Sequence, residues 1–281
     1  MKQESLLART QKILRRFDFK TRKQLGQHFL IDEDVLQFIV NAAELTPADN
    51  VIEVGAGLGV LTQELAQRAG RLFAIEMDDK LAKILQKTPA SFPNTTIINE
   101  NVLNIAPSSL SATEPYKVVA NLPYYITSPV LRHFLEAKAK PQMILVMVQK
   151  EVAEVIAARA GQRSVLSISV QFYGRPEIVR YVPASAFYPA PEVDSALLKI
   201  AVYPEPIVAV SNVEGFFAIV RAGFTTPRKQ IANSLSQGLN IAKGEAQHLL
   251  EQAGVAPQRR AETLTMEEWA KLYEVHTTGA N

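Results

Sequence analysis

The chain has 281 residues, of which 47% are hydrophobic and 21% are charged, as in ordinary globular proteins. It contains no cysteine, which excludes disulfides, cysteine–zinc sites and a thiolate nucleophile, and which fits a reducing, cytoplasmic location. We expect no membrane segment, because no apolar run approaches the roughly eighteen residues that cross a bilayer. We also expect no metal site, because the four histidines lack ligand spacing.

Basic residues are concentrated at the N-terminus, although the net charge of the whole chain is only +2. Residues 1–30 contain eight Lys and Arg against two acids, Glu4 and Asp18, so the remainder is mildly acidic. We predict that residues 1–30 form a basic arm, with an amphipathic segment over 1–22. Such an arm on an acidic body indicates contact with a polyanion, although a solvated basic tail has the same composition.

Short apolar strands alternate with amphipathic helices between residues 31 and 160. The strands are expected at 51–54, 71–76, 95–98, 116–120 and 141–148. The helices are expected at 32–44, 58–69, 128–137 and 151–160, with another that begins at Asp78. This alternation predicts an α/β fold of the Rossmann-like type, with a mostly parallel sheet and right-handed crossovers.

The pattern changes after residue 160. Residues 164–173, 177–182 and 195–202 are rich in β-branched and aromatic residues, so we expect consecutive strands that end the sheet with an antiparallel edge hairpin. A linker with two prolines at 203–206 marks a boundary, and the pattern beyond it is helical. We therefore predict a Rossmann-like domain over 31–203 and a small, all-helical domain over 207–281.

A glycine-rich loop follows the first expected strand and precedes a helix. Its spacing, Gly55-x-Gly57-x-Gly59, allows the backbone to approach a ligand closely. Glu76 ends the second strand about twenty residues later, where a carboxylate can accept hydrogen bonds from both ribose hydroxyls. The order of strand, loop, helix, strand and acid therefore predicts a ligand that contains a nucleoside.

Two cofactors compete for this site. A dinucleotide site prefers G-x-G-x-x-G/A, but here the third glycine comes one residue early and Val60 occupies the sixth position. S-adenosylmethionine (SAM) has no phosphate and carries a sulfonium charge, which Glu53 and Glu76 tolerate better than they tolerate a pyrophosphate. We therefore favour SAM, with Asn101 or its alternative Glu100, after the third strand, at the adenine edge.

The run Asn121-Leu122-Pro123-Tyr124-Tyr125 follows the fourth expected strand, at the edge of the sheet where α/β proteins bind ligands. Asn121 offers a carbonyl acceptor, and Pro123 biases Leu122 toward an extended backbone whose carbonyl can face the cleft. Tyr124 can present a flat ring. Two acceptors and a ring face suit a planar base with an exocyclic amino group, held out of its stack. A strand-ending turn with buried aromatics is the alternative.

Six ordered segments carry a resemblance to one family: KQLGQHFL, VIEVGAGLGVLT, AIEMD, ANLPYYITSP, VMVQKEVAE and FYPAPEVDSALLKI. They run from Lys23 to Ile200 and resemble the KsgA (RsmA) family of ribosomal RNA adenine N6,N6-dimethyltransferases, which are class I SAM-dependent enzymes. A looser match, RAGFTTPRKQIANSL, lies in the C-terminal segment. The resemblance implies dimethylation of two adjacent adenines in small-subunit ribosomal RNA, within the 30S subunit or its precursor. We expect a monomer.

The resemblance also implies roles for individual residues. The residues that would contact the cofactor, including those of a covering loop near the end of the arm, are His28, Leu30, Gly55, Gly57, Glu76, Asn101 and Asn121. The residues that would act on the base are Asn121, Leu122 through its carbonyl, and Tyr124 and Phe187 on its two faces. The residues expected to bind RNA phosphates are Arg22, Lys23, Arg221, Arg228 and Lys229. No residue is expected to bind a metal.

Three of these positions need comment. The family more often carries Asp at position 101 and Asn at position 28, so this chain departs from the common form at Asn101 and His28. Asn101 still offers an acceptor to an adenine amino group but no charge, so we expect weaker cofactor binding at most. Phe187 has an alternative role as a core residue under a proline-rich turn.

Three rival functions are weighed against this one. A large-subunit RNA methyltransferase that confers antibiotic resistance is disfavoured by the GQHFL loop and by TTPRKQIANSL. A non-catalytic RNA-binding assembly factor on the same scaffold would not need Glu76, Asn121 and Tyr124 together. A nicotinamide oxidoreductase is disfavoured by the glycine spacing and by the lack of a hydride-site constellation.

Overall fold

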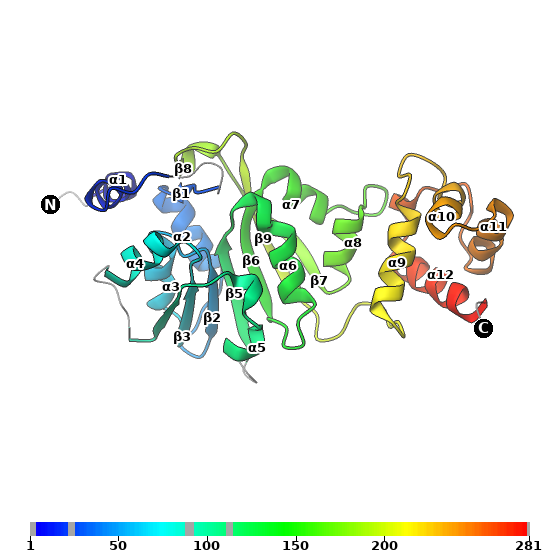
Figure 1. The fold of residues 1–281 in the computed structure, drawn as a ribbon, viewed down its shortest axis with the longest axis horizontal. Helices are drawn as coiled ribbons and strands as arrows, with labels where there is room; N and C mark the ends of the chain where they lie inside the picture. The colour runs from blue at the N-terminus through cyan, green and yellow to red at the C-terminus, as the bar shows by residue number, and fades with distance from the viewer. Residues whose placement is uncertain (1–3, 22–25, 88–92, 111–114, 280–281) are drawn as a thin grey trace. The chain divides into compact units, whose positions relative to one another are not determined.

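A computed structural model describes residues 4–21, 26–87, 93–110 and 115–279 (Figure 1). The chain divides by its contacts into two compact units. The first unit comprises residues 1–153 and 176–204, and the second comprises residues 154–175 and 205–281. Among the described residues, no helix combines the length and the apolar character that a membrane crossing requires.

The first unit is built on a seven-stranded sheet with the order β4-β3-β2-β5-β6-β9-β7. Its strands are β2 (Asn50–Val54), β3 (Arg71–Ile75), β4 (Thr95–Ile98), β5 (Tyr116–Asn121), β6 (Met143–Gln149), β7 (Gly174–Val182) and β9 (Ser195–Val202). All pairs from β4 to β6 are parallel and β9 is antiparallel to β6, which confirms the mostly parallel α/β sheet with an antiparallel edge. The chain extends the sheet in one direction from β2 and in the other from β5. Such a reversal of strand order is where open α/β sheets bind ligands.

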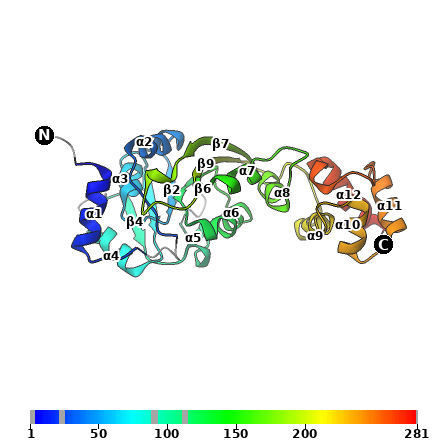
Figure 2. The same cartoon turned by 90° about the horizontal axis from the view of Figure 1, so that it is seen from above.

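Helices flank this sheet because its central strands are apolar on both faces (Figure 2). They are α2 (Glu33–Ala42), α3 (Val60–Ala66), α4 (Asp79–Lys87), α5 (Pro107–Leu110), α6 (Thr127–Leu135) and α7 (Lys150–Ile156). Ile39 of α2 and Leu65 of α3 share one buried cluster with Val119 of β5 and Leu145 of β6. Because alternate strand residues face opposite sides of a sheet, these two strand side chains define the face that α2 and α3 cover.

The N-terminal segment forms a helix that packs on the first unit. Helix α1 (Leu6–Arg16) is capped by the Ser5 hydroxyl, which accepts a hydrogen bond from the Ala8 N–H. Leu6 belongs to the main buried cluster, while Leu14 and Phe19 pack with Phe29. The exposed basic residues of this segment are Lys12, Arg15, Arg16 and Lys20. The predicted RNA contacts Arg22 and Lys23 lie outside the described residues.

One predicted strand is wrong, because residues 164–173 contain helix α8 (Val165–Gln171) instead. Ser164 and Ser167 form a reciprocal capping box at its start. The Gln171 side-chain amide then donates to the carbonyls of Ile156 and Ala158, at 2.9 and 2.8 Å. The β-branched residues in this stretch favoured a strand locally, but tertiary packing overrides that propensity.

Residues 154–175 belong by their contacts to the second unit, whereas the sequence-based boundary at 203–206 placed them in the first domain. The physical reason is a set of contacts with the C-terminal helices. Phe172 stacks on Phe216 with ring centroids 5.1 Å apart, and the Gly161 N–H donates to the Glu262 carbonyl at 2.8 Å. The second unit otherwise consists of α9 (Val213–Gly223), α10 (Ile231–Leu239), α11 (Lys243–Gln252) and α12 (Met266–Gly279).

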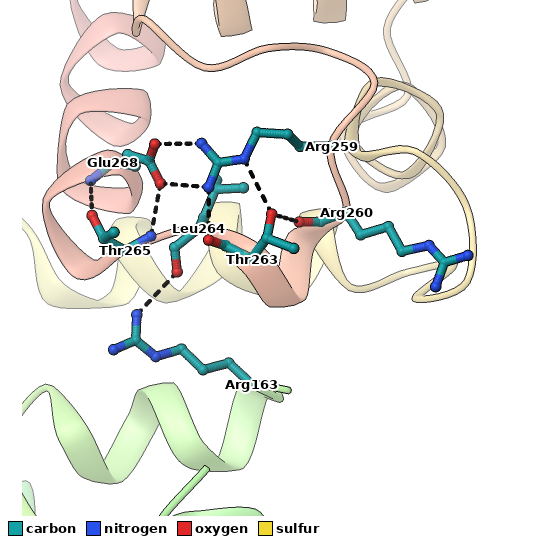
Figure 3. A network of polar contacts seen from close by, with 7 residues as sticks. All are labelled: Arg163, Arg259, Arg260, Thr263, Leu264, Thr265 and Glu268. Atoms are coloured by element: carbon teal, nitrogen blue, oxygen red, sulfur yellow. Dashed lines mark hydrogen bonds and ion pairs between the residues drawn. The ribbon is translucent and has the colours of Figure 1, made fainter. Parts of the chain in front are cut away.

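A polar network ties the same segment to the start of α12 (Figure 3). Arg163 donates to the Leu264 carbonyl at 3.0 Å, and the Arg259 guanidinium makes a two-bond contact with the Glu268 carboxylate. Glu268 also accepts from the Thr265 N–H at 2.8 Å. These bonds fix the turn before α12, whose Trp269 is fully buried.

Helices α9 and α10 cross so closely that only glycine fits at one contact point. A Cβ atom on Gly238 would lie 2.5 Å from the Ala222 Cα. Gly238→Ala should therefore lower the free energy of unfolding of the second unit by about 1–3 kcal/mol, because the helices must separate. The fluorescence of Trp269, the only tryptophan in the chain, reports this transition in urea.

Gly244 of α11 gives a matched control, because a Cβ atom there would have no neighbour within 4 Å. Gly244→Ala should leave stability unchanged or raise it slightly, since alanine favours helices. Equal effects of the two substitutions would contradict the close crossing.

Candidate functional site

A cavity of about 430 Å³ lies in the first unit, where the strand order reverses. The loops after β2, β3, β4 and β5 line it, together with residues 26–30. This volume lies in the usual range for cofactor sites. The seven residues predicted to contact a cofactor all lie on its wall, and they are His28, Leu30, Gly55, Gly57, Glu76, Asn101 and Asn121.

The glycine loop after β2 adopts a backbone that other residues rarely take. Gly55 and Gly57 have φ angles of 75° and 57°, in the left-handed region. A Cβ atom on Gly57 would meet the Phe29 ring at 3.4 Å, and one on Gly55 would lie 3.5 Å from the Asn121 carbonyl oxygen. The loop therefore packs tightly against both residues 26–30 and the end of β5.

The Glu76 carboxylate organises this loop. One oxygen accepts a hydrogen bond from the Gly57 N–H and the other from the Asp78 N–H, both at 2.8 Å. Burial raises the pKa of Glu76, while these two N–H groups lower it in part. These two backbone bonds hold the Glu76 carboxylate in one orientation. Each oxygen keeps a further lone pair that can accept a hydrogen bond from a ligand.

Glu53 is the site residue that sequence reasoning left without a defined role. Its side chain is 1% exposed and lines the cavity, and one carboxyl oxygen has no hydrogen-bond partner among the described residues. Burial raises the pKa of Glu53 to about 8. A buried polar atom without a partner carries a free-energy cost, which a ligand's donor group in the cavity would remove. The signal in the sequence was an acid inside an otherwise apolar strand.

Asn101 begins a short turn at the far end of the cavity. Its side-chain oxygen accepts a hydrogen bond from the Leu103 N–H at 3.0 Å, as the cap of the 3₁₀ helix Val102–Asn104. Glu100, the alternative residue at the adenine edge, accepts hydrogen bonds from the Asn101 N–H and from the Asn104 side-chain amide. Both residues line the cavity.

The motif after β5 is anchored at each residue that the sequence singled out. The Asn121 side-chain amide donates to the His28 carbonyl at 3.2 Å, which leaves its own oxygen as the acceptor. The Leu122 N–H donates to the Met147 carbonyl at 3.3 Å, and its side chain is buried. The Tyr124 hydroxyl is hydrogen-bonded to Ser195 at 2.7 Å. Burial is the main reason that the pKa of Tyr124 is raised, so its phenol is neutral at physiological pH.

His28 connects this motif to a second loop. Its Nδ1–H donates to the Pro189 carbonyl at 2.7 Å, and its ring stacks on Tyr124 with centroids 6.0 Å apart and planes inclined by 21°. A base inserted between two rings needs about 7 Å, since each contact takes about 3.5 Å. Stacking of a base on this face of Tyr124 therefore requires the His28 ring to turn away.

Phe187 does not reach the cavity. It is 3% exposed and belongs to the main buried cluster. A two-stranded antiparallel sheet of β1 (Phe29–Leu30) and β8 (Phe187–Tyr188) pairs it with Leu30. The structure thus gives Phe187 the core position that was its alternative, where it holds Leu30 on the cavity wall. Asn121, Pro123 and Tyr125 line the cavity, whereas Leu122 and Tyr124 are not among its lining residues.

The remaining predicted residues lie in the second unit. Arg221, Arg228 and Lys229 are all exposed, at the end of α9 and in the turn before α10. Exposed Arg and Lys side chains are available for phosphate contacts. Within the described part of the chain, no group of three or more His, Asp or Glu is arranged to hold a metal ion.

Comparison with known sequences gives a consistent result over nearly the whole chain. A family model described as ribosomal RNA adenine dimethylase matches residues 18–278. Ribosomal RNA small subunit methyltransferase A of Dehalococcoides mccartyi is 51% identical over 97% of this chain and 94% of that protein. The protein of the same name from Alkaliphilus metalliredigens is 43% identical over 94% of this chain and 95% of its own length.

Solved structures agree on the fold. The 23S rRNA methyltransferase ErmE is 30% identical, with a TM-score of 0.70 over 88% of this chain and 98% of that one. A dimethyladenosine transferase from Plasmodium falciparum has a TM-score of 0.76 over 90% of this chain and 98% of that one, at 23% identity. Both support a methyltransferase-like α/β fold with a helical C-terminal region.

The raised pKa of Glu53 predicts a stability that depends on pH. Below about pH 4.5 the carboxyl is protonated in both the folded and the unfolded chain, whereas up to about pH 8 it ionises only when unfolded. The free energy of unfolding should therefore fall as the pH rises through this window. Glu53→Gln cannot ionise, so its stability relative to the unaltered protein should rise by about 3–4 kcal/mol between pH 5 and pH 8. Urea denaturation of both proteins at the two pH values measures this difference, and parallel pH profiles would contradict it.

Proposed function

The chain belongs to the ribosomal RNA adenine dimethylase family, and from this membership we propose that it transfers methyl groups from SAM to the N6 atoms of two adjacent adenines in small-subunit ribosomal RNA. The product is N6,N6-dimethyladenosine. The 30S subunit or its precursor is the substrate, and the protein acts as a cytoplasmic monomer without a metal. The observation that carries the proposal is the Asn121 side chain at the cavity wall, whose amide nitrogen donates to the His28 carbonyl and whose oxygen is left as an acceptor.

The cavity fits SAM in both shape and charge. Gly55 and Gly57 allow a ligand to lie against the backbone, and Glu76 presents a fixed carboxylate suited to a ribose diol. Glu53 also lines the cavity, and a cationic ligand beside it would favour its ionised form. His28 and Leu30 would cover the cofactor, and Asn101 would bind its adenine. When bound, SAM supplies a methyl group activated by a sulfonium.

The protein's contribution to the reaction is to hold the amino group of the base. The lone pair of N6 is delocalised into the adenine ring, so this nitrogen is a poor nucleophile. The Asn121 side-chain oxygen and the Leu122 carbonyl would each accept one N–H bond and favour a tetrahedral nitrogen with an available lone pair. These acceptors stabilise the positive charge that develops on nitrogen in the transition state. The alkylated amine then loses its proton to water.

Tyr124 would stack on the flipped base and hold its plane. The Ser195 bond holds the ring at its hydroxyl end, and its face would become available to the base once the His28 ring turns away. A stack of this kind contributes about 1–3 kcal/mol per base. Phe187 is buried in this structure, so a contact between Phe187 and the base would require β8 to move.

RNA binding would come from basic residues in both units. In the second unit the candidates are Arg221, Arg228 and Lys229. The exposed basic side chains of α1, which are Lys12, Arg15 and Arg16, are candidates in the first unit. Arg22 and Lys23 are further candidates from the sequence. Phosphate contacts of this kind weaken steeply with salt.

The main alternative is methylation of large-subunit RNA, as in the 23S rRNA methyltransferase. Identity to that protein is 30%, against 51% to a small-subunit methyltransferase, which favours the small-subunit substrate. A non-catalytic assembly role would leave the anchored Asn121 and Tyr124 without a purpose.

Substitution of Asn121 tests the proposed chemistry. Undermethylated 30S subunits are incubated with labelled SAM, and the RNA is digested to nucleosides. The unaltered protein should give N6,N6-dimethyladenosine, and Asn121→Ala should lower kcat by about 100- to 1000-fold, as expected when one transition-state partner is removed. Asn41→Ala is the control, because Asn41 of α2 is exposed and lies outside the cavity wall. A product methylated on carbon, or equal rates for the two variants, would overturn the proposal.

Asn101→Asp tests the cofactor orientation. An aspartate at this position can still cap the Leu103 N–H and adds a negative charge that strengthens a hydrogen bond from an adenine amino group. The Kd for SAM, measured by calorimetry, should fall by up to about tenfold. A weaker affinity would show that the adenine lies elsewhere.

A further inference from the structure

Tyr125 is an exposed aromatic residue on the wall of the cavity. Its side chain is 54% exposed, although it lies within the short helix Tyr124–Ile126 beside the residues that would grip the base. The mechanism described above does not use it. Tyrosine is intermediate in its average burial, so it is the combination of exposure and a place on the cavity wall that makes this ring available to a ligand.

Two hydrogen bonds hold the backbone on either side of Tyr125, whereas its ring is open. The Ile126 N–H donates to the Pro123 carbonyl at 3.1 Å, and the Thr127 hydroxyl donates to the Tyr124 carbonyl at 3.2 Å. Helix α6 follows at once. Among the described residues, no hydrogen bond, ring stack or cation contact involves the Tyr125 side chain. The turn therefore fixes where the Tyr125 side chain leaves the backbone, while the surface of its ring is free.

The two other aromatics of the predicted base site do not offer such a face. The Tyr124 ring carries His28 on one side and is tied to Ser195, while Phe187 is buried. Tyr125 is thus the aromatic residue at the cavity that a second base can reach without rearrangement.

Exposure alone does not carry the argument, as Tyr181 of β7 shows. Tyr181 is 53% exposed, but it lies outside the cavity wall and the Lys150 Nζ lies 5.5 Å from its ring centroid. The combination that sets Tyr125 apart is an open ring, a fixed backbone and contact with the cavity.

We propose that Tyr125 is a stacking platform for the unpaired nucleotide next to the adenine being methylated. This inference rests on the proposed function, in which the two substrate adenines are adjacent. Proteins recognise unpaired RNA by stacking bases on aromatic side chains, and purines offer the largest faces. While the Asn121 side chain holds one adenine, the base of the adjacent nucleotide packs on the Tyr125 ring. Tyr125 thereby positions the RNA without touching the reacting atoms.

The test separates RNA binding from chemistry and from cofactor binding. Steady-state methylation of undermethylated 30S subunits gives KM and kcat for the unaltered protein, Tyr125→Ala, Tyr125→Phe and Tyr181→Ala, and calorimetry gives the Kd for SAM. Tyr125→Ala should raise KM about tenfold, in line with the loss of one base stack, while kcat and the Kd for SAM change less than twofold. Tyr125→Phe should restore KM, because the ring and not the hydroxyl stacks, and Tyr181→Ala should match the unaltered protein.

Three results would overturn the inference. They are an unchanged KM for the subunits in Tyr125→Ala, a rise in the Kd for SAM in Tyr125→Ala, and a failure of Tyr125→Phe to restore KM. Absence of dimethyladenosine with the unaltered protein would overturn the proposed function instead. The two failures are therefore distinguishable in one experiment.

Discussion

The hydrogen bond from the Asn121 side chain to the His28 carbonyl is the interaction on which the site depends. It joins two segments 93 residues apart in the chain, the end of β5 and the loop that lines the cavity before β1. Because the amide nitrogen is engaged, the amide oxygen has a defined direction. The loop that contains His28 is itself held by Pro189 and by the pairing of β1 with β8. The acceptor of the proposed reaction is thus positioned by contacts that reach across the first unit.

The electrostatics of the cavity follow from its place at the carboxyl ends of parallel strands. Glu53 and Glu76 end adjacent strands, and burial raises the pKa of both. Glu76 offsets this with two backbone N–H bonds, whereas Glu53 has one oxygen without a partner in the described chain. The Glu76 carboxylate repels an anionic ligand, and the Glu53 carboxyl, neutral below about pH 8, supplies no positive charge to attract one. This charge pattern separates the site from a pyrophosphate-binding cleft on a similar sheet.

The elements that sequence alone predicted are those set by local rules. The glycine loop, Glu76 and the Asn121 motif follow strands whose apolar runs are unambiguous, so their meeting at one edge follows from parallel topology. The misassigned helix α8 depends on distant partners, because Phe172 packs on Phe216 and β-branched content alone favoured a strand. The burial of Phe187 likewise depends on the pairing of β8 with β1, which spans most of the first unit and has no local signature.

The same turn explains why the Tyr125 ring is exposed and why the Tyr124 ring is covered by its neighbours. The turn Tyr124–Ile126 places successive side chains on different sides, so the first ring is drawn toward Ser195 and His28 while the next faces solvent at the cavity wall. A single flipped base needs only the first ring. In the proposed reaction on two neighbouring adenines, the second ring would hold one base while the other is methylated, and the two aromatics that would do so are consecutive in the chain.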